Sequence, residues 1–220
     1  LFHQQLKRTA EIAQILNARP GEIIFNSGGT ESNNSAIFGV LDKLVEDGMK
    51  IEDMHLIISK MEHPSVLNYF KHFEKRGATL DIVGIDKDGQ IDLKEFKKLL
   101  KPNTVLISIM FVNNEIGIIQ PMEEITKIVR GFKKKILKNH ESITPILHSD
   151  SAQALLYIPL NTLKLGIDLL SFDSQKIYGP KGCGVLYVRK GLKINSLIVG
   201  GTQERNLRSG TENTPLIVGF

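Results

Sequence analysis

The sequence predicts an α/β fold in which helices cover a mostly parallel sheet. Short apolar runs rich in β-branched residues recur along the chain, flanked by Gly, Pro or Asn. Longer stretches with a helical spacing of apolar residues separate these runs. Strands that alternate with helices form parallel sheets covered on both faces. Ligands of such sheets bind at the carboxyl ends of the strands.

The predicted elements follow one another along the chain as one large domain. A helical pattern with Leu6, Ile12 and Leu16 comes first, without a preceding cap. The apolar runs that we predict as strands are 22–25, 55–59, 79–85, 104–112, 144–149, 168–172 and 184–188. The predicted helices between them are 30–47, 63–76, 93–100 and 122–137. The sequence stops inside an apolar segment that ends at Phe220, so we expect residues 1–220 to be a fragment lacking both ends of a longer polypeptide.

Composition narrows the class of protein. At 220 residues, with 41% hydrophobic and 24% charged residues, the chain can bury the core of a globular domain. The basic run Lys133-Lys134-Lys135 has no interleaved aromatic residues, which favours a solvated helix face over a nucleic-acid site. A single cysteine fits a reducing compartment, so we expect the cytoplasm. The longest apolar stretch, near 105–112, is too short to cross a membrane.

Lys176 and Asp150 each follow a predicted strand, and together they suggest pyridoxal phosphate (PLP) chemistry. A lysine amine is needed to hold the cofactor aldehyde as a Schiff base, and a carboxylate keeps the pyridine nitrogen protonated. Ser27-Gly28-Gly29-Thr30 joins a strand to a helix, where backbone N–H groups could cradle a phosphate. A tight turn capped by threonine explains the same residues equally simply.

Two further strand ends carry polar side chains. His63, in Glu62-His63-Pro64, could stack on a cofactor ring and move protons, or it could be structural. In Asn113-Asn114, one asparagine could donate to a phenolic oxygen while the other holds a turn.

Other ligand chemistries remain as alternatives for two segments. His148 and Asp150 share a strand face, so they could also be two metal ligands or part of a serine-type triad. No third metal ligand or nucleophile motif accompanies them in the sequence. The segment 85–96 resembles a calcium loop, yet aligning Gly89 with the required glycine puts Gly84 at the first ligand position. We therefore predict a strand-to-helix turn there, and no metal site.

Six motifs occur in one order that closely resembles the cysteine desulfurases of the class V aminotransferase group. The motifs, which span about 21–219, are 25–34, Glu62-His63-Pro64, 112–117, Asp150 with Gln153, 176–182 and Arg208-Ser209-Gly210-Thr211. Each motif alone is modest, but six in sequence are specific. The resemblance implies the large, cofactor-binding domain of a dimeric fold type I PLP enzyme. Such an enzyme converts L-cysteine to L-alanine and passes sulfur as a persulfide to acceptors, such as an iron-sulfur scaffold or a tRNA-thiolation pathway.

The resemblance also implies roles for individual residues. Lys176 and His63 would be catalytic, with Lys176 holding the cofactor and His63 stacking on it. Asp150 would pair with the ring nitrogen. The remaining cofactor-binding residues would be Gly29 and Thr30 at the phosphate, Asn114 and Gln153 at the ring oxygen, Ser174 and Gln175 before the lysine, and Thr211 at the phosphate of the neighbouring subunit.

This chain departs from the family pattern beside the lysine. The family has serine, any residue, then histidine, where this chain has Asp173-Ser174-Gln175. Two like charges about 4 Å apart at an effective dielectric of about 20 repel by roughly 4 kcal/mol. We therefore expect that Asp173 turns away from the phosphate, is shielded by a cation, or weakens cofactor binding, with Ser174 as a substitute contact.

The persulfide-forming cysteine of the family lies beyond these residues, so we expect the isolated fragment to be inactive. Cys183 lies between two glycines at a strand start, and we expect it to be a small buried residue. Two alternatives remain open. One is another class V enzyme, such as a selenocysteine lyase or a transaminase, and the other is a degenerate homologue that acts as a scaffold.

Overall fold

The computed structural model describes residues 2–138 and 143–220. Its centre is one seven-stranded sheet with the order β1-β7-β6-β5-β4-β2-β3. The strands are β1 (Ile23–Asn26), β2 (His55–Ser59), β3 (Thr79–Val83), β4 (Thr104–Ser108), β5 (Ile146–Asp150), β6 (Leu169–Asp173) and β7 (Gly184–Val188). The predicted α/β fold with a mostly parallel sheet is therefore confirmed.

Only β7 runs against its neighbours in this sheet. The strands β3, β2, β4, β5 and β6 pair in parallel, whereas β7 pairs antiparallel with both β6 and β1. A parallel neighbour needs a crossover of a dozen or more residues, usually through a helix. The short connection 174–183 between β6 and β7 contains no such crossover, which accounts for the reversal.

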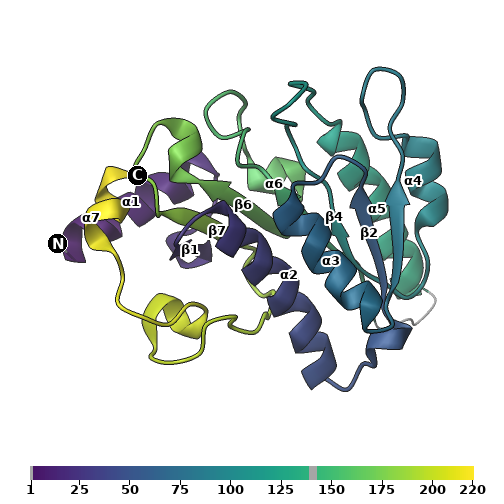
Figure 1. Cartoon of the computed structure of the whole chain (residues 1–220), viewed down its shortest axis with the longest axis horizontal. Coiled ribbons are helices and arrows are strands. Elements are labelled where there is room, and N and C mark those ends of the chain that lie inside the picture. The colour runs from purple at the N-terminus through teal and green to yellow at the C-terminus, as the bar shows by residue number, and fades with distance from the viewer. Residues whose placement is uncertain (1, 139–142) are drawn as a thin grey trace.

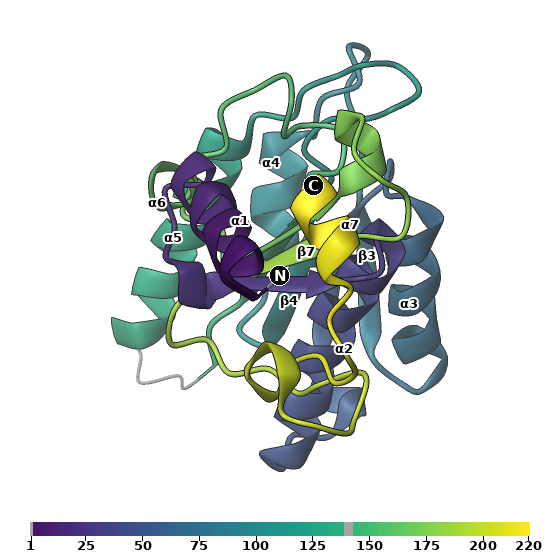
Figure 2. The ribbon, with the colours of Figure 1, turned by 90° about the vertical axis from the view of Figure 1, so that its left-hand side faces the viewer.

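Helices cover both faces of the sheet (Figure 1). The α-helices are α1 (Phe2–Ile15), α2 (Gly29–Glu46), α3 (Pro64–Lys75), α4 (Leu93–Leu99), α5 (Met122–Lys138), α6 (Thr162–Leu165) and α7 (Thr214–Gly219). Short 3-10 helices are η1 (Pro20–Glu22), η2 (Ile51–Asp53), η3 (Ser174–Ile177) and η4 (Gln203–Asn206). Figure 2 shows α1 and α7 side by side, and Arg8 Nε donates 3.0 Å to the carbonyl of Val218 there. Among the described residues, no helix is long and apolar enough to span a bilayer.

Two hydrophobic cores lie on opposite faces of the sheet. Ile37 of α2 and Phe70 of α3 pack with Leu56 on one face. On the other face, Phe96 of α4 and Ile125 of α5 pack with residues such as Ile57. Successive residues of a strand thus pack into different cores, one on each face of the sheet. This explains why the strands are continuously apolar instead of alternating between apolar and polar residues.

The predicted boundaries differ from the observed ones by a few residues. β4 ends at Ser108 rather than near residue 112, but the chain beyond it still follows β5, because Phe111 N–H donates 2.9 Å to the Asp150 carbonyl. After β3, Asp86 accepts the N–H groups of Asp88 and Gln90 in a turn that leads to α4. The predicted strand-to-helix turn is therefore present. The short helices α6 and α7 were not predicted.

Candidate active site

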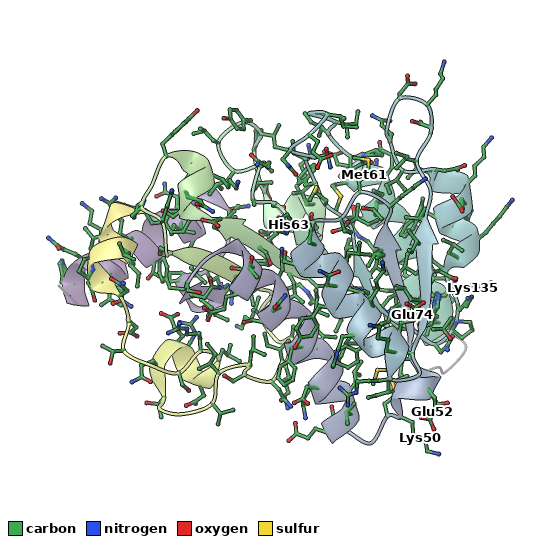
Figure 3. The ribbon with its side chains drawn as sticks, viewed as in Figure 1. Lys50, Glu52, Met61, His63, Glu74 and Lys135 are labelled. Carbon is green, nitrogen blue, oxygen red and sulfur yellow. The ribbon has the colours of Figure 1, made fainter. Side chains whose placement is uncertain are left out.

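The carboxyl ends of the parallel strands lie along one edge of the molecule. β2 begins at His55, just after η2, and ends at Ser59, just before Met61. Figure 3 shows Met61 and His63 toward the upper edge and Glu52 of η2 at the lower edge. In an open sheet of this kind, ligands bind outside the carboxyl ends of the strands. The upper edge is therefore the expected location of a site.

A pocket of about 170 Å³ opens among these strand ends, and we call it the strand-end pocket. Its walls come from the start of α2, the loops after β2, β4 and β5, and the end of β6. The lining residues are Gly29, Thr30, Asn33, His63, Ser65, Met110, Val112, Asn114, Asp150, Ala152, Gln153, Asp173, Gln175 and Lys176. All of the predicted site residues except Ser174 and Thr211 are among them.

Asp150 is a buried carboxylate at the end of β5. Oδ2 accepts a hydrogen bond of 2.8 Å from Asn33 Nδ2, and Oδ1 accepts one of 3.1 Å from the Ala152 N–H. Burial raises the pKa of the Asp150 carboxyl, while the hydrogen bonds from Ala152 and Asn33 act in the opposite direction. A carboxylate held this way can receive a positively charged N–H donor from a ligand.

Asn33 was missed by the sequence analysis. It lies on α2, one turn after Thr30, and only 1% of it is exposed. Its Oδ1 is buried without a hydrogen-bond partner among the described residues, although Asn33 lines the pocket. Buried polar atoms are nearly always paired, so this oxygen is available to a bound donor. The available signal was the one-turn spacing from Thr30, which places both side chains on one helix face.

His63 is connected to Asp150 through Asn33. Asn33 Nδ2 also donates 2.9 Å to Ser65 Oγ, which lies 2.7 Å from Nδ1 of His63. His63 is the N-cap of α3, because its Nδ1 accepts 3.1 Å from the Ser65 N–H, and Pro64 occupies the first helical position. Since Nδ1 is an acceptor, the proton of the neutral ring lies on Nε2.

Lys176 lies on η3, immediately after β6, and its exposed side chain lines the same pocket as Asp150. Tyr178 ends η3 with a left-handed backbone (φ 64°), which turns the chain back toward β7. A primary amine and a buried carboxylate therefore meet in one pocket. Asn114 also lines it, while Asn113 Oδ1 accepts from the N–H groups of Glu115 and Ile116. Asn113 therefore holds the turn, and the contact predicted for Asn114 with a ring oxygen stays a prediction.

The start of α2 forms the polar end of the strand-end pocket. Gly28 has a φ of 147°, a conformation that favours glycine, and the N–H of Gly29 points out of the helix. This N–H donates 3.1 Å to Oδ2 of Asp173, whose Oδ1 accepts 3.0 Å from the Gln175 N–H. The Asp173 carboxylate does not turn away from the predicted phosphate cradle. It lies in it.

Ser174 and Thr211 lie outside the strand-end pocket. Ser174 is fully buried against Gly179, and its Oγ has no partner among the described residues. Thr211 lines a second cavity of about 200 Å³, together with Cys183 and Glu204. Cys183 is 2% exposed, and burial raises the pKa of its thiol to about 12. The prediction of a buried cysteine is confirmed.

Glu62 is a second buried carboxyl group that the sequence analysis did not select. Its Oε1 accepts 2.5 Å from Ser59 Oγ and 2.6 Å from the Met110 N–H, which ties the loop before α3 to the chain after β4. Burial raises the pKa of Glu62 to about 8. The group is thus largely protonated at neutral pH. An acidic residue just after a fully buried strand was the available signal.

His148 does not pair with Asp150. Its Nδ1 lies 2.8 Å from Ser108 Oγ and its Nε2 lies 2.9 Å from Ser171 Oγ, so both ring nitrogens are engaged inside the sheet. Burial lowers the pKa of the ring to about 3. Within the part of the chain that the structure describes, no group of three or more His, Cys, Asp and Glu residues is arranged to hold a metal.

The residues of the strand-end pocket fit PLP at the ring end of the cofactor. Asp150 offers a buried anion for a protonated ring nitrogen, the unpartnered Oδ1 of Asn33 offers an acceptor, and Lys176 offers an amine for the aldehyde. At the phosphate end, Gly29 offers a helix N-terminus whose N–H bonds to Asp173.

Comparisons with known proteins agree on one family. A model of the family "Aminotransferase class-V" matches residues 2–220. The cysteine desulfurase IscS of Dictyoglomus turgidum is 45% identical, over 96% of this chain and 49% of its own length. The mitochondrial cysteine desulfurase of Saccharomyces cerevisiae is 44% identical, over 96% of this chain and 40% of its own. The chain therefore spans about half the length of these relatives.

Solved structures give the same result. A NifS-like protein superposes with a TM-score of 0.86 at 40% identity, covering 98% of this chain and 55% of the other. DndA from Streptomyces lividans superposes with a TM-score of 0.84 at 33% identity, covering 99% and 58%.

Proposed function

Because this chain belongs to the class V aminotransferase family, we propose that residues 1–220 are the cofactor-binding large domain of a PLP-dependent cysteine desulfurase. The proposed reaction removes sulfur from L-cysteine, leaves L-alanine and passes the sulfur to an acceptor. The observation that carries the proposal is the strand-end pocket, where Lys176 and Asp150 line a single cavity. Relatives named cysteine desulfurase, at 39–45% identity, support the substrate.

In this proposal each pocket residue has a defined task. Lys176 holds the cofactor aldehyde, Asp150 keeps the ring nitrogen protonated, and His63 stacks on the ring. Asn114 and Gln153 contact the ring oxygen, and Gly29 with Thr30 and Gln175 face the phosphate. PLP, when bound, supplies an electron sink for the negative charge that develops at the α-carbon of the amino acid.

Lys176, Asp150 and His63 hold or transfer the protons that the proposed reaction requires. The amine of Lys176 would serve as the general base and acid that takes the proton from the substrate α-carbon and returns one to the product. Asn33 stabilises the ionised form of Asp150 through the hydrogen bond of 2.8 Å. His63 keeps a proton on Nε2, because Nδ1 accepts the Ser65 N–H, and can donate it toward the pocket.

Sulfur transfer needs a thiol that Cys183 does not supply. A thiol with a pKa near 12 that is 2% exposed is neither ionised nor accessible at neutral pH. The persulfide-forming cysteine would therefore come from another segment of the protein. We further propose a cytoplasmic homodimer in which Thr211 reaches the phosphate in the neighbouring subunit, with an iron-sulfur scaffold as sulfur acceptor.

A second candidate function is a non-catalytic homologue that uses the fold as a scaffold. The Asp173 carboxylate in the phosphate cradle favours it, because this charge opposes a phosphate. A class V lyase or transaminase that acts on another amino acid would share Lys176 and Asp150 with the desulfurase.

The test uses the purified full-length protein. PLP should produce a visible absorbance band, and L-cysteine should yield sulfide and L-alanine in the presence of a thiol reductant. Lys176→Ala should abolish both, while Lys181→Ala, an exposed lysine in the same loop, should retain both. A band without sulfide release would favour the lyase or transaminase, and no band would favour the scaffold.

A further inference from the structure

Asp173 occupies the anion-binding end of the strand-end pocket. Its Oδ2 accepts 3.1 Å from the Gly29 N–H, the first free N–H of α2, and 3.1 Å from Gln175 Nε2. Its Oδ1 accepts 3.0 Å from the Gln175 N–H. Three N–H donors from two segments thus converge on one carboxylate, which is the donor pattern that a phosphate oxygen would also use.

The carboxylate is held tightly in this position. Asp173 is 8% exposed, and a Cβ placed on Gly29 would lie 3.4 Å from its Oδ2, so the carboxylate packs against the glycine backbone. Among the residues that the structure describes, no lysine, arginine or histidine forms an ion pair with Asp173. The helix N-terminus and the Gln175 donors therefore stabilise the negative charge without a neutralising cation.

An independent feature of the same pocket indicates a ligand. One turn along α2, Oδ1 of Asn33 is buried and unpartnered, and Asn33 lines the pocket with Asp173. The pocket is thus prepared for a polar ligand at one end and carries an internal anion at the other. A ligand with a phosphate group would meet the Asp173 charge at close range.

We propose that Asp173 is a specificity-determining residue that acts as an internal substitute for phosphate at the N-terminus of α2. A phosphate group can take this position only by displacing the carboxylate. The inference rests on the proposed function, since the phosphate is that of the proposed cofactor. The new element is that the Asp173 carboxylate competes with the phosphate of PLP, so PLP binds more weakly relative to pyridoxal, its unphosphorylated form.

The experiment measures equilibrium binding to the full-length protein. The probes are PLP, pyridoxal and inorganic phosphate, each titrated against wild type, Asp173→Ser and Asp173→Asn. Serine opens the space and removes the charge, whereas asparagine keeps the shape, removes the charge and replaces one acceptor oxygen by an NH2 donor. Asp92→Asn is the matched control, because Asp92 also caps a helix, accepting from the N–H groups of Lys94 and Glu95, but does not line the pocket.

Both Asp173 variants should bind PLP about tenfold or more tightly than wild type, while pyridoxal affinity stays within about twofold. Inorganic phosphate should raise the melting temperature of Asp173→Ser but not that of wild type. Without any ligand, Asp173→Ser should melt at a lower temperature, because Gly29 and Gln175 lose their acceptor. Asp92→Asn should change stability and leave all three affinities unaltered.

Unchanged or weaker PLP and phosphate binding in both Asp173 variants would overturn the inference. If no protein binds PLP or pyridoxal, the proposed function fails, and the inference is then decided by phosphate alone. Stabilisation of Asp173→Ser by phosphate would still support it, and equal behaviour of wild type and variant would still reject it.

Discussion

Asn33 Nδ2 donates a hydrogen bond of 2.8 Å to Oδ2 of Asp150, joining α2 to the end of β5 across the pocket. The same nitrogen donates 2.9 Å to Ser65 Oγ, so one amide coordinates the carboxylate and the loop that carries His63. One side chain, Asn33, therefore helps to position both Asp150, proposed to pair with the ring nitrogen, and His63, proposed to stack on the ring.

Replacing Asn33 by alanine should weaken both the fold and the site. Asp150 would lose one of its two donors while remaining buried, at a cost of about 1–3 kcal/mol in the free energy of unfolding. Its pKa should rise further, so PLP should bind more weakly. Asn34→Ala is the matched control, because it removes a hydrogen bond of 2.8 Å to the Ser65 carbonyl without touching Asp150. Equal PLP affinities in the two variants would contradict this role for Asn33.

Glu62 should make the protein less stable as the pH rises. Its pKa is about 8 in the folded chain against an ordinary value of 4.5, so the folded state binds the proton more tightly. The stabilisation is complete below about pH 4.5 and is lost as pH rises through about 8, with an upper bound of about 5 kcal/mol.

Urea unfolding of Glu62→Gln between pH 5 and 9 tests this. Glutamine keeps the acceptor for Ser59 and Met110 but does not titrate, so the variant should gain stability relative to wild type with increasing pH. Glu74→Gln, at an exposed glutamate of α3 (Figure 3), should run parallel to wild type. A Glu62→Gln curve that also runs parallel would show that Glu62 titrates normally.

His63 should contribute to stability and to ligand binding through different atoms. His63→Ala removes the cap of α3 and should cost about 1 kcal/mol of unfolding free energy. His63→Asn supplies another capping side chain and should recover most of that loss. Neither variant has a ring to stack on PLP, so both should lose about 0.5–1.5 kcal/mol of binding free energy. Recovery of PLP affinity by asparagine would argue against stacking.

Cys183 should be unreactive in the folded protein. Its thiol is 2% exposed with a pKa near 12, so thiolate is scarce and reagents have little access. Iodoacetamide labelling followed by peptide mass spectrometry should find Cys183 unmodified in buffer and fully modified in urea. Fast labelling of the native protein would show that the second cavity opens to solvent.

Sequence patterns were sufficient for the sheet but not for its antiparallel strand. Apolar runs such as 55–59 and 184–188 coincide with β2 and β7, because strands buried on both faces carry uninterrupted hydrophobicity. Such runs do not indicate the direction of a strand, so the antiparallel pairing of β7 could not be predicted from them. The helix α7, which follows Asn213, is too short for periodicity to reveal it.

Most residues of the candidate site could be predicted because they lie at the carboxyl ends of predicted strands. Lys176, Asp150 and His63 line one pocket because each lies at or just after the carboxyl end of a parallel strand, which the sequence pattern predicts. Asn33 and Glu62 belong to motifs that the sequence shows, but they were not predicted as site residues, because their importance lies in contacts between elements distant in sequence. The position of Asp173 was left among three alternatives, because charge repulsion alone does not say which donors surround a carboxylate.

Peptide mapping can identify the lysine that holds the cofactor. The full-length protein is incubated with PLP, reduced with borohydride and digested, and the pyridoxyl-modified peptide is identified by mass spectrometry. We expect modification of Lys176, diminished by Asp150→Asn and unaffected by Lys181→Ala. Modification of a different lysine, or of none, would contradict the proposed function.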